Sequence, residues 1–208
     1  MRQKILVLIL LLICACDIKR PSIGFVELKT VNPNIVLDIR YASENNFLKK
    51  AVYPSARCFV LRIVATKLDS IQIELETMKL GLKVFDGYRP LSVQKMMWEI
   101  LPDNRYVADP KDGSRHNRGA AVDVTLVDSN GVDLVMPTDF DDFTEKSAHD
   151  YNELPEITIK NREILKSIME KYGFVSLNSE WWHYDLKNFN DYPVVDFSFQ
   201  EIDNFNIK

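Results

Sequence analysis

The sequence has few of the residues that most often carry chemistry or cross-links. Its 208 residues include only three cysteines and three histidines. Lysine and arginine (26) do not outnumber aspartate and glutamate (30), and a net charge of -4 gives no basic footprint for nucleic acid. The long apolar run at residues 5–13 is shorter than the roughly 20 residues of a membrane-spanning helix. These scarcities argue against nucleic-acid-binding and polytopic membrane proteins, and the 46% hydrophobic content favours a soluble globular domain.

The N-terminal apolar run has the pattern of an export signal. Arg2 and Lys4 precede it, and Ala15-Cys16 follows it, as in the lipobox of bacterial lipoproteins. We therefore expect a lipoprotein-type signal at residues 1–16 and a lipid anchor on Cys16. An ordinary signal peptide with incidental cysteines is the alternative. Either segment predicts an exported protein of the cell envelope or periplasm, with a tether at 17–24 and a single domain at 25–208.

Cys58 would then be the remaining cysteine, so no intrachain disulfide is expected in the mature chain. The apolar residues 59–61 follow it, which favours a small buried side chain. A catalytic thiol is the alternative, but the neighbouring sequence offers no base.

The hydrophobic pattern predicts a mixture of strands and helices. Segments rich in β-branched or apolar residues predict strands at 34–41, 82–85 and 119–127, and a strand-like segment at 174–186. Apolar residues recurring every three or four positions predict helices at about 57–80, 90–100 and 158–172. Gly81 is the expected C-cap of the first helix, residues 128–131 (D-S-N-G) form a hairpin turn, and residues 42–55 and 102–113 are loops.

Two of the three histidines lie in patterns typical of a metal site. Residues 114–123 read S-R-H-N-R-G-A-A-V-D, which contains His116 and Asp123, and His183 ends the sequence E-W-W-H. Two histidines and one carboxylate are the usual ligands of a catalytic zinc ion. A structural His–Asp hydrogen bond is the alternative.

Glu180 lies three residues before His183 and would suit the proton shuttle of such a site. Residues three apart on a regular strand point to opposite faces, so the chain must bend between them if both serve one metal ion.

Two further segments carry side chains that could line a pocket. Arg89 lies at a strand-to-helix junction, where it is either aimed into a site or held in a surface salt bridge. Residues 139–150 are acidic but interrupted by Phe140 and Phe143, so they form either a solvated loop or the lip of a pocket.

The order of the motifs resembles that of the zinc D-alanyl-D-alanine dipeptidases of the hedgehog/DD-peptidase superfamily. Residues 114–123 fit S-x-H-x-x-G-x-A-x-D and residues 180–183 fit E-x-W-H. The segment R-Y-A-S-E-N-N-F at 40–47 is similar to their R-Y-A-T-x-x-N-F element. The family order continues with A-R-C at 56–58, D-G-Y-R-P at 86–90, F-D at 140–141, S-I-M-E at 167–170 and G-F at 173–174. The similarity covers residues 36–185.

The resemblance implies an α+β fold of one domain, with a central, mainly antiparallel sheet flanked by helices. It implies one Zn²⁺ per chain and a small D,D-dipeptide as substrate. The ligands of the zinc ion would be His116, Asp123 and His183. Glu180 would be the general base, and Arg89 would stabilise the transition state. Asp141 would meet the substrate ammonium, and Ser114 would touch substrate or brace the first ligand.

Arg115 departs from the vancomycin-resistance type of this family, which has a small serine at that position, so the substrate choice can differ. The lipoprotein-like start is a second departure. A zinc D,D- or L,D-carboxypeptidase acting on peptidoglycan stem peptides is the nearest alternative. A non-catalytic muropeptide-binding lipoprotein is another, which the presence of Glu180 and all three ligand candidates disfavours. The sequence does not indicate an oligomeric state.

Overall fold

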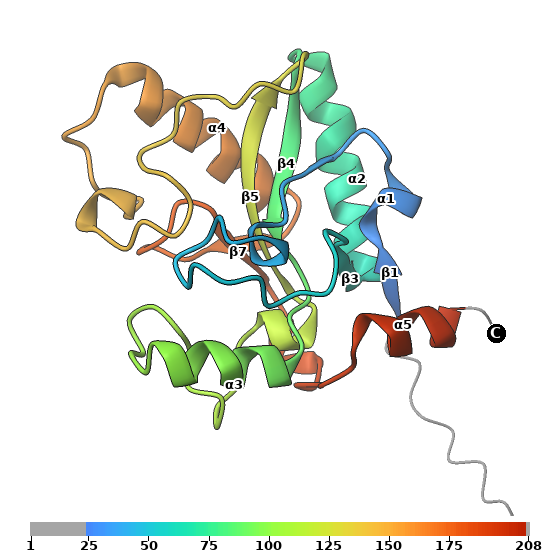
Figure 1. The fold of residues 1–208 in the computed structure, drawn as a ribbon. Helices are drawn as coiled ribbons and strands as arrows, with labels where there is room; N and C mark the ends of the chain where they lie inside the picture. Colours follow the sequence, from blue (N-terminus) through green and yellow to red (C-terminus); the bar gives the residue numbers. More distant parts are fainter. Residues whose placement is uncertain (1–23, 207–208) are drawn as a thin grey trace, which may run out of the picture.

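A five-stranded sheet forms the centre of the molecule, which a computed structural model describes for residues 24–206 (Figure 1). The strands lie in the order β2 (Val36–Leu37), β4 (Leu80–Asp86), β5 (Ala121–Asp128), β7 (His183–Leu186) and β6 (Phe174–Ser176). The pairing of β2 with β4 is parallel and the other pairings are antiparallel. The expected single domain with a mainly antiparallel sheet and flanking helices is confirmed.

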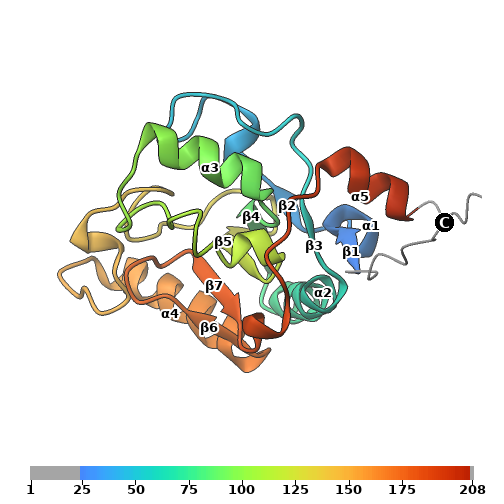
Figure 2. The ribbon, with the colours of Figure 1, turned by 90° about the horizontal axis from the view of Figure 1, so that it is seen from below.

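The two long helices α2 (Arg62–Thr77) and α4 (Glu156–Lys171) cover one face of this sheet (Figure 2). They lie side by side, because Lys171 Nζ contacts Glu74 Oε2 at 2.6 Å and Tyr172 Oη donates to the same carboxylate. Helix α3 (Leu91–Ile100) lies on the other face (Figure 2). Side chains alternate along each strand, so half of each central strand packs under α2 and α4 and half faces the α3 side.

A smaller unit packs beside the sheet. Strand β1 (Phe25–Glu27) pairs with β3 (Phe59–Leu61), and the helices α1 (Leu28–Val31) and α5 (Phe199–Asn206) lie near it (Figure 1). Arg57 connects β1 to α5, since the Arg57 guanidinium forms ion pairs with both Glu27 and Asp203. No sequence pattern predicted β1, α1 or α5, which are short and take their stability from packing.

Two predicted elements begin or end differently in the structure. The strand expected at 34–41 is a two-residue strand followed by a 3₁₀ turn, Arg40–Ala42. The helix expected from about residue 57 starts at Arg62, because residues 59–61 pair with β1 and are fully buried. A short apolar run does not distinguish a buried strand from a helix, and here tertiary pairing decided.

The first helix also ends earlier than expected. Met78 caps α2, Lys79 takes the left-handed backbone conformation (φ 59°), and Gly81 already lies in β4. The expected turn at 128–131 is confirmed, since the Asp128 amide donates to the Val132 carbonyl and Gly131 has φ 79°. Helices α3 and α4 are confirmed to within two residues.

Cys58 is 2% exposed, which confirms the buried side chain, and burial raises the pKa of its thiol well above the ordinary value. The predicted signal at residues 1–16 and all of the predicted tether except Gly24 lie outside the described residues. Within residues 24–206, no helix is both long and apolar enough to cross a membrane.

Candidate metal centre

The pairing of β5 with β7 places two of the predicted ligands side by side. Asp123 lies directly opposite His183 in this antiparallel ladder. Side chains of directly opposed residues share one face of a sheet. Val122 and Tyr184 are the next opposed pair, and they point to the face covered by α2 and α4. Asp123 and His183 therefore both face the α3 side.

His116 reaches the same place from the 3₁₀ turn His116–Arg118 that precedes β5. Gly119 ends this turn with φ 66°, and a Cβ there would lie 2.2 Å from the Phe25 ring, so the turn requires glycine. The His116 Nδ1 lies 2.8 Å from the Gly87 carbonyl and donates its proton to it. The Nε2 atom is thereby left as the free lone pair that points toward Asp123 and His183.

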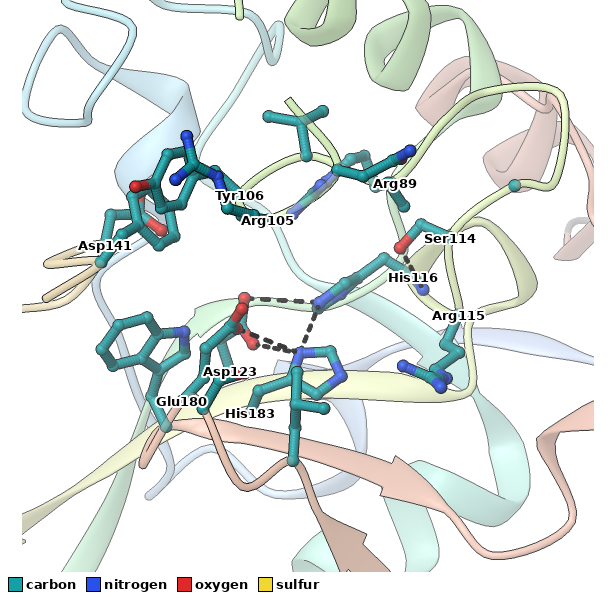
Figure 3. A pocket seen from close by; sticks show the side chains of 18 of the residues that line it. Arg89, Arg105, Tyr106, Ser114, Arg115, His116, Asp123, Asp141, Glu180 and His183 are labelled. Carbon is teal, nitrogen blue, oxygen red and sulfur yellow. Dashed lines mark hydrogen bonds and ion pairs between the residues drawn. The ribbon is translucent and has the colours of Figure 1, made fainter. Parts of the chain in front are cut away.

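The three side chains converge in the interior (Figure 3). His116 Nε2 is 3.3 Å from His183 Nδ1 and 3.4 Å from Asp123 Oδ2, and His183 Nδ1 is 3.0 Å from Asp123 Oδ1. All three residues are at most 6% exposed. The chain thus brings together three predicted site residues that are up to 67 positions apart. A group of this composition can hold a metal ion.

The close contacts within this group shift the pKa values of Asp123 and His183 in opposite directions. Burial opposes ionisation of Asp123, but the charges and hydrogen bonds of His116 and His183 outweigh it and hold its pKa below the ordinary value. For His183, burial lowers the pKa, but hydrogen bonds to Asp123 and Asp185 outweigh it and raise the pKa well above the ordinary value. Both shifts have the same cause, a carboxylate and an imidazole in direct contact in a buried setting.

Glu180 lies beside the group but is not part of it. It belongs to the hairpin loop between β6 and β7, where its amide donates to the Leu177 carbonyl and its carbonyl accepts from the His183 amide. This loop supplies the bend that the spacing of Glu180 and His183 requires. Glu180 Oε2 is 4.0 Å from His183 Nδ1. Burial is the main reason that the Glu180 pKa is raised, and the negative charge of Asp123 adds to it.

Arg89 lies in the wall of the same cavity. It is 8% exposed, so the alternative of a surface arginine is wrong, although the expected salt bridge exists. Its guanidinium donates twice to Asp86 Oδ2, at 2.7 and 3.2 Å, and once to Gln94 at 2.9 Å. It also stacks 5.1 Å from the centre of the Tyr41 ring. These contacts hold the cation at the junction of β4 and α3.

Asp141 lines the cavity on the side away from Arg115 (Figure 3). Its backbone is left-handed (φ 61°), a conformation that Asp adopts more readily than most residues and that often marks a functional position. The Tyr41 hydroxyl donates to its carboxylate at 3.1 Å. Burial, and next the charge of Asp123, raise the Asp141 pKa well above the ordinary value. The segment around Asp141 and Phe143 is thus the lip of a pocket rather than a solvated loop.

Ser114 also lines the cavity, and its Oγ accepts from the His116 amide at 3.2 Å. This contact braces the turn that carries His116. The cavity has a volume of about 690 Å³ and opens in front of the three-residue group. Aromatic side chains form much of its wall: Phe47, Tyr106, Phe143, Trp182 and Phe189.

Sequence reasoning missed three supporting residues. Asp86 holds Arg89, Tyr41 holds Asp141, and Asp185 accepts from His183 Nε2 at 3.0 Å. The signal for Asp185 was its position two residues after His183, which puts both on one face of a strand. Asp86 and Tyr41 lay inside recognised motifs, but only the fold shows which side chains they touch.

The cavity therefore contains a metal-binding group, a partly buried proton acceptor beside it (Glu180) and a cation held in its wall (Arg89). That combination defines a metal-dependent hydrolase.

Comparisons with known proteins identify the family. Residues 21–202 match the family model described as D-ala-D-ala dipeptidase. The chain is 36% identical to D-alanyl-D-alanine dipeptidase of Escherichia coli (strain K12), over 82% of this chain and 88% of that protein. It is 32% identical to D-alanyl-D-alanine dipeptidase of Enterococcus faecalis, over 85% of this chain and 97% of that protein. The chain belongs to the D-ala-D-ala dipeptidase family of metallopeptidases.

Among solved structures, vancomycin resistance D,D-dipeptidase VanXYg in complex with a D-Ala-D-Ala phosphinate analog is similar over 87% of this chain and 74% of that chain. The sequence identity is 20% and the TM-score is 0.40, a likeness too low to add to the family assignment.

Proposed function

We propose that this chain hydrolyses the free dipeptide D-Ala-D-Ala with one zinc ion held by His116, Asp123 and His183. The observation that carries this proposal is the convergence of their donor atoms: the two histidine nitrogens are 3.3 Å apart, and each lies 3.0–3.4 Å from one oxygen of Asp123. Ligand atoms about 2.0–2.1 Å from a tetrahedral zinc ion lie about 3.3 Å apart, so the spacing fits this metal. A bound zinc ion would lower the pKa of its water to about 7, as is typical of catalytic zinc sites, and would polarise the peptide carbonyl.

Glu180 is the proposed general base. Its carboxylate faces the metal-binding group without entering it, so it can accept a proton from the attacking water and pass it to the leaving amine. Burial, the main cause of its raised pKa, makes it a stronger proton acceptor than an exposed carboxylate.

Arg89 is proposed to stabilise the oxyanion that forms from the peptide carbonyl. Its bonds to Asp86 and Gln94 fix the guanidinium before substrate arrives, so little reorganisation is needed in the transition state. Losing one such donor typically costs about 10²–10³ in kcat.

Asp141 is proposed to pair with the free ammonium of the dipeptide. A partly buried carboxylate whose pKa is raised gains most from a cationic partner, because the partner offsets the cost of burying the charge. A substrate with an acylated amino group would leave Asp141 without that partner. Ser114 is proposed to brace His116 through its backbone contact.

The decisive experiment compares three substrates on the purified protein, together with its zinc content. We expect hydrolysis of D-Ala-D-Ala, and rates at least about 10²-fold lower for N-acetyl-D-Ala-D-Ala and for a stem pentapeptide, since both lack the ammonium at that position. Faster cleavage of the pentapeptide would identify a carboxypeptidase instead. Zinc binding with no hydrolysis of any of the three would identify a binding module.

We also propose that the protein is exported and held at the cell envelope by a lipid on Cys16. The support is the sequence alone: two basic residues, the apolar run 5–13, and Ala15-Cys16. Growth with labelled palmitate should label the parent protein and leave Cys16→Ser unlabelled. Equal labelling of both would refute the anchor.

A further inference from the structure

His183 is held from two sides by carboxylates. Its Nδ1 faces Asp123 at 3.0 Å, and its Nε2 lies 3.0 Å from Asp185 Oδ1. A neutral imidazole carries one proton, and donation from Nε2 to Asp185 leaves the lone pair on Nδ1. The Nδ1 atom is the one that faces His116 and Asp123, so the contact with Asp185 selects the tautomer that can bind a cation.

Asp185 is itself a buried charge that needs compensation. It is 6% exposed and lies on β7, two residues after His183. Its second oxygen, Oδ2, lies 3.2 Å from Arg115 Nε. Each carboxylate oxygen therefore has one polar partner, and the two contacts together fix the orientation of the carboxylate.

Arg115 connects the two segments that carry the histidines. It directly precedes His116 in the chain, and its side chain reaches Asp185, two residues beyond His183. Its guanidinium rests 5.0 Å from the centre of the Phe189 ring, which fixes the direction of the side chain. A serine at this position would be too short to reach across.

We propose that Asp185 and Arg115 are positioning residues that hold His183 in the orientation and tautomer required for metal binding, and that they thereby set the metal affinity of this protein. This proposal rests on the proposed metal site. It gives Arg115 a role through His183 rather than through substrate contact. Residues that orient a ligating histidine typically change metal affinity about 10–100-fold when they are removed.

The test measures zinc affinity of the metal-free full-length protein by competition with a chromophoric chelator. We expect Asp185→Ala to weaken zinc binding about 10–100-fold, and Asp185→Asn less, because the amide oxygen still accepts from His183 Nε2. Arg115→Met should weaken it about 3–10-fold, since Asp185 keeps its contact but loses its counter-charge. Arg115→Lys should restore part of that loss.

Two comparisons isolate the mechanism. If Arg115 acts through Asp185, adding Arg115→Met to Asp185→Ala should cause no further loss of zinc affinity. Lys187→Met is the matched control, because it removes an exposed positive charge two residues beyond Asp185 and should leave zinc binding unchanged. The visible spectrum of the cobalt-substituted protein should change in Asp185→Ala and stay unchanged in Lys187→Met.

Circular dichroism establishes that each variant is folded. The Arg115 side chain is 42% exposed, so its removal admits water and should not unfold the protein. Zinc affinity within twofold of the parent in folded Asp185→Ala would overturn the proposal, and so would an equal loss in Asp185→Asn and Asp185→Ala. A raised KM with unchanged zinc affinity in Arg115→Met would overturn the role of Arg115 and assign it to substrate. Failure of the parent itself to bind zinc would instead refute the proposed function.

Discussion

At the scale of single residues, Glu180 lies beside the metal-binding group without being part of it. It lies in the hairpin loop, 4.0 Å from His183 Nδ1, whereas the candidate ligands lie 3.0–3.4 Å from one another. A side chain placed in this way can be changed without removing a donor atom from the group.

We therefore predict that Glu180→Gln retains zinc and lowers kcat about 10²–10⁴-fold, the usual contribution of a general base. Zinc content by atomic absorption and steady-state hydrolysis of D-Ala-D-Ala measure the two quantities. His116→Ala is the opposite control, because it removes a donor atom and should lose zinc. Near-normal turnover in Glu180→Gln would remove Glu180 from the mechanism.

At the scale of elements, the turn that ends at Gly119 delivers His116 to the sheet. The turn leads into β5 with a left-handed glycine, and the Phe25 ring of β1 packs against that glycine. The smaller β1–β3 unit thereby affects the position of His116, because the Phe25 ring of β1 leaves no room for a side chain at position 119.

Gly119→Ala should destabilise the protein by about 2–4 kcal/mol, since it adds both backbone strain and a clash with Phe25. Gly131→Ala is the matched control: Gly131 also has positive φ, but nothing lies within 4 Å of the added Cβ. It should cost only about 1 kcal/mol, the strain contribution alone. Urea denaturation gives both values, and equal losses would show that the contact with Phe25 has no energetic effect.

At the scale of the whole molecule, the segment 139–150, which contains His149, packs against α4, since Arg162 Nη1 donates to the Ala148 carbonyl. His149 is 5% exposed, and neither of its ring nitrogens has a hydrogen-bond partner among the described residues. Burial, then the positive charges of Lys166 and Arg162, lower its pKa to about 4, with Asp150 opposing them. Its packed state is therefore the neutral one.

Because this pKa lies below the ordinary value of about 6.5, the unfolded chain binds the proton more tightly. The stability from neutral His149 is present above about pH 6.5 and is lost as the pH falls toward 4. We predict a loss on the order of 1–2 kcal/mol from this residue after allowance for screening. The unfolding free energy, measured with chelator present, should depend less on pH in His149→Phe than in the parent. Parallel pH profiles would contradict this role.

Local patterns were sufficient for part of this protein. The periodicity of residues 158–172 and 90–100 predicted α4 and α3, because amphipathic helices carry their partner face in their own sequence. The D-S-N-G turn was predicted because glycine supplies the positive φ that the turn needs. The residue types His, Asp, His and Glu indicated a metal site before any geometry was known, with a structural His–Asp hydrogen bond as the alternative.

The tertiary structure decided the rest. The ladder register that sets Asp123 opposite His183, and the contacts of Tyr41 with Asp141 and of Arg115 with Asp185, arise between residues distant in the chain. The segment 59–61 became a strand because β1 lies beside it, which no local propensity encodes. Sequence thus determined which chemistry the chain can carry, and folding determined which atoms meet, since distances between remote residues depend on the packing of the whole sheet.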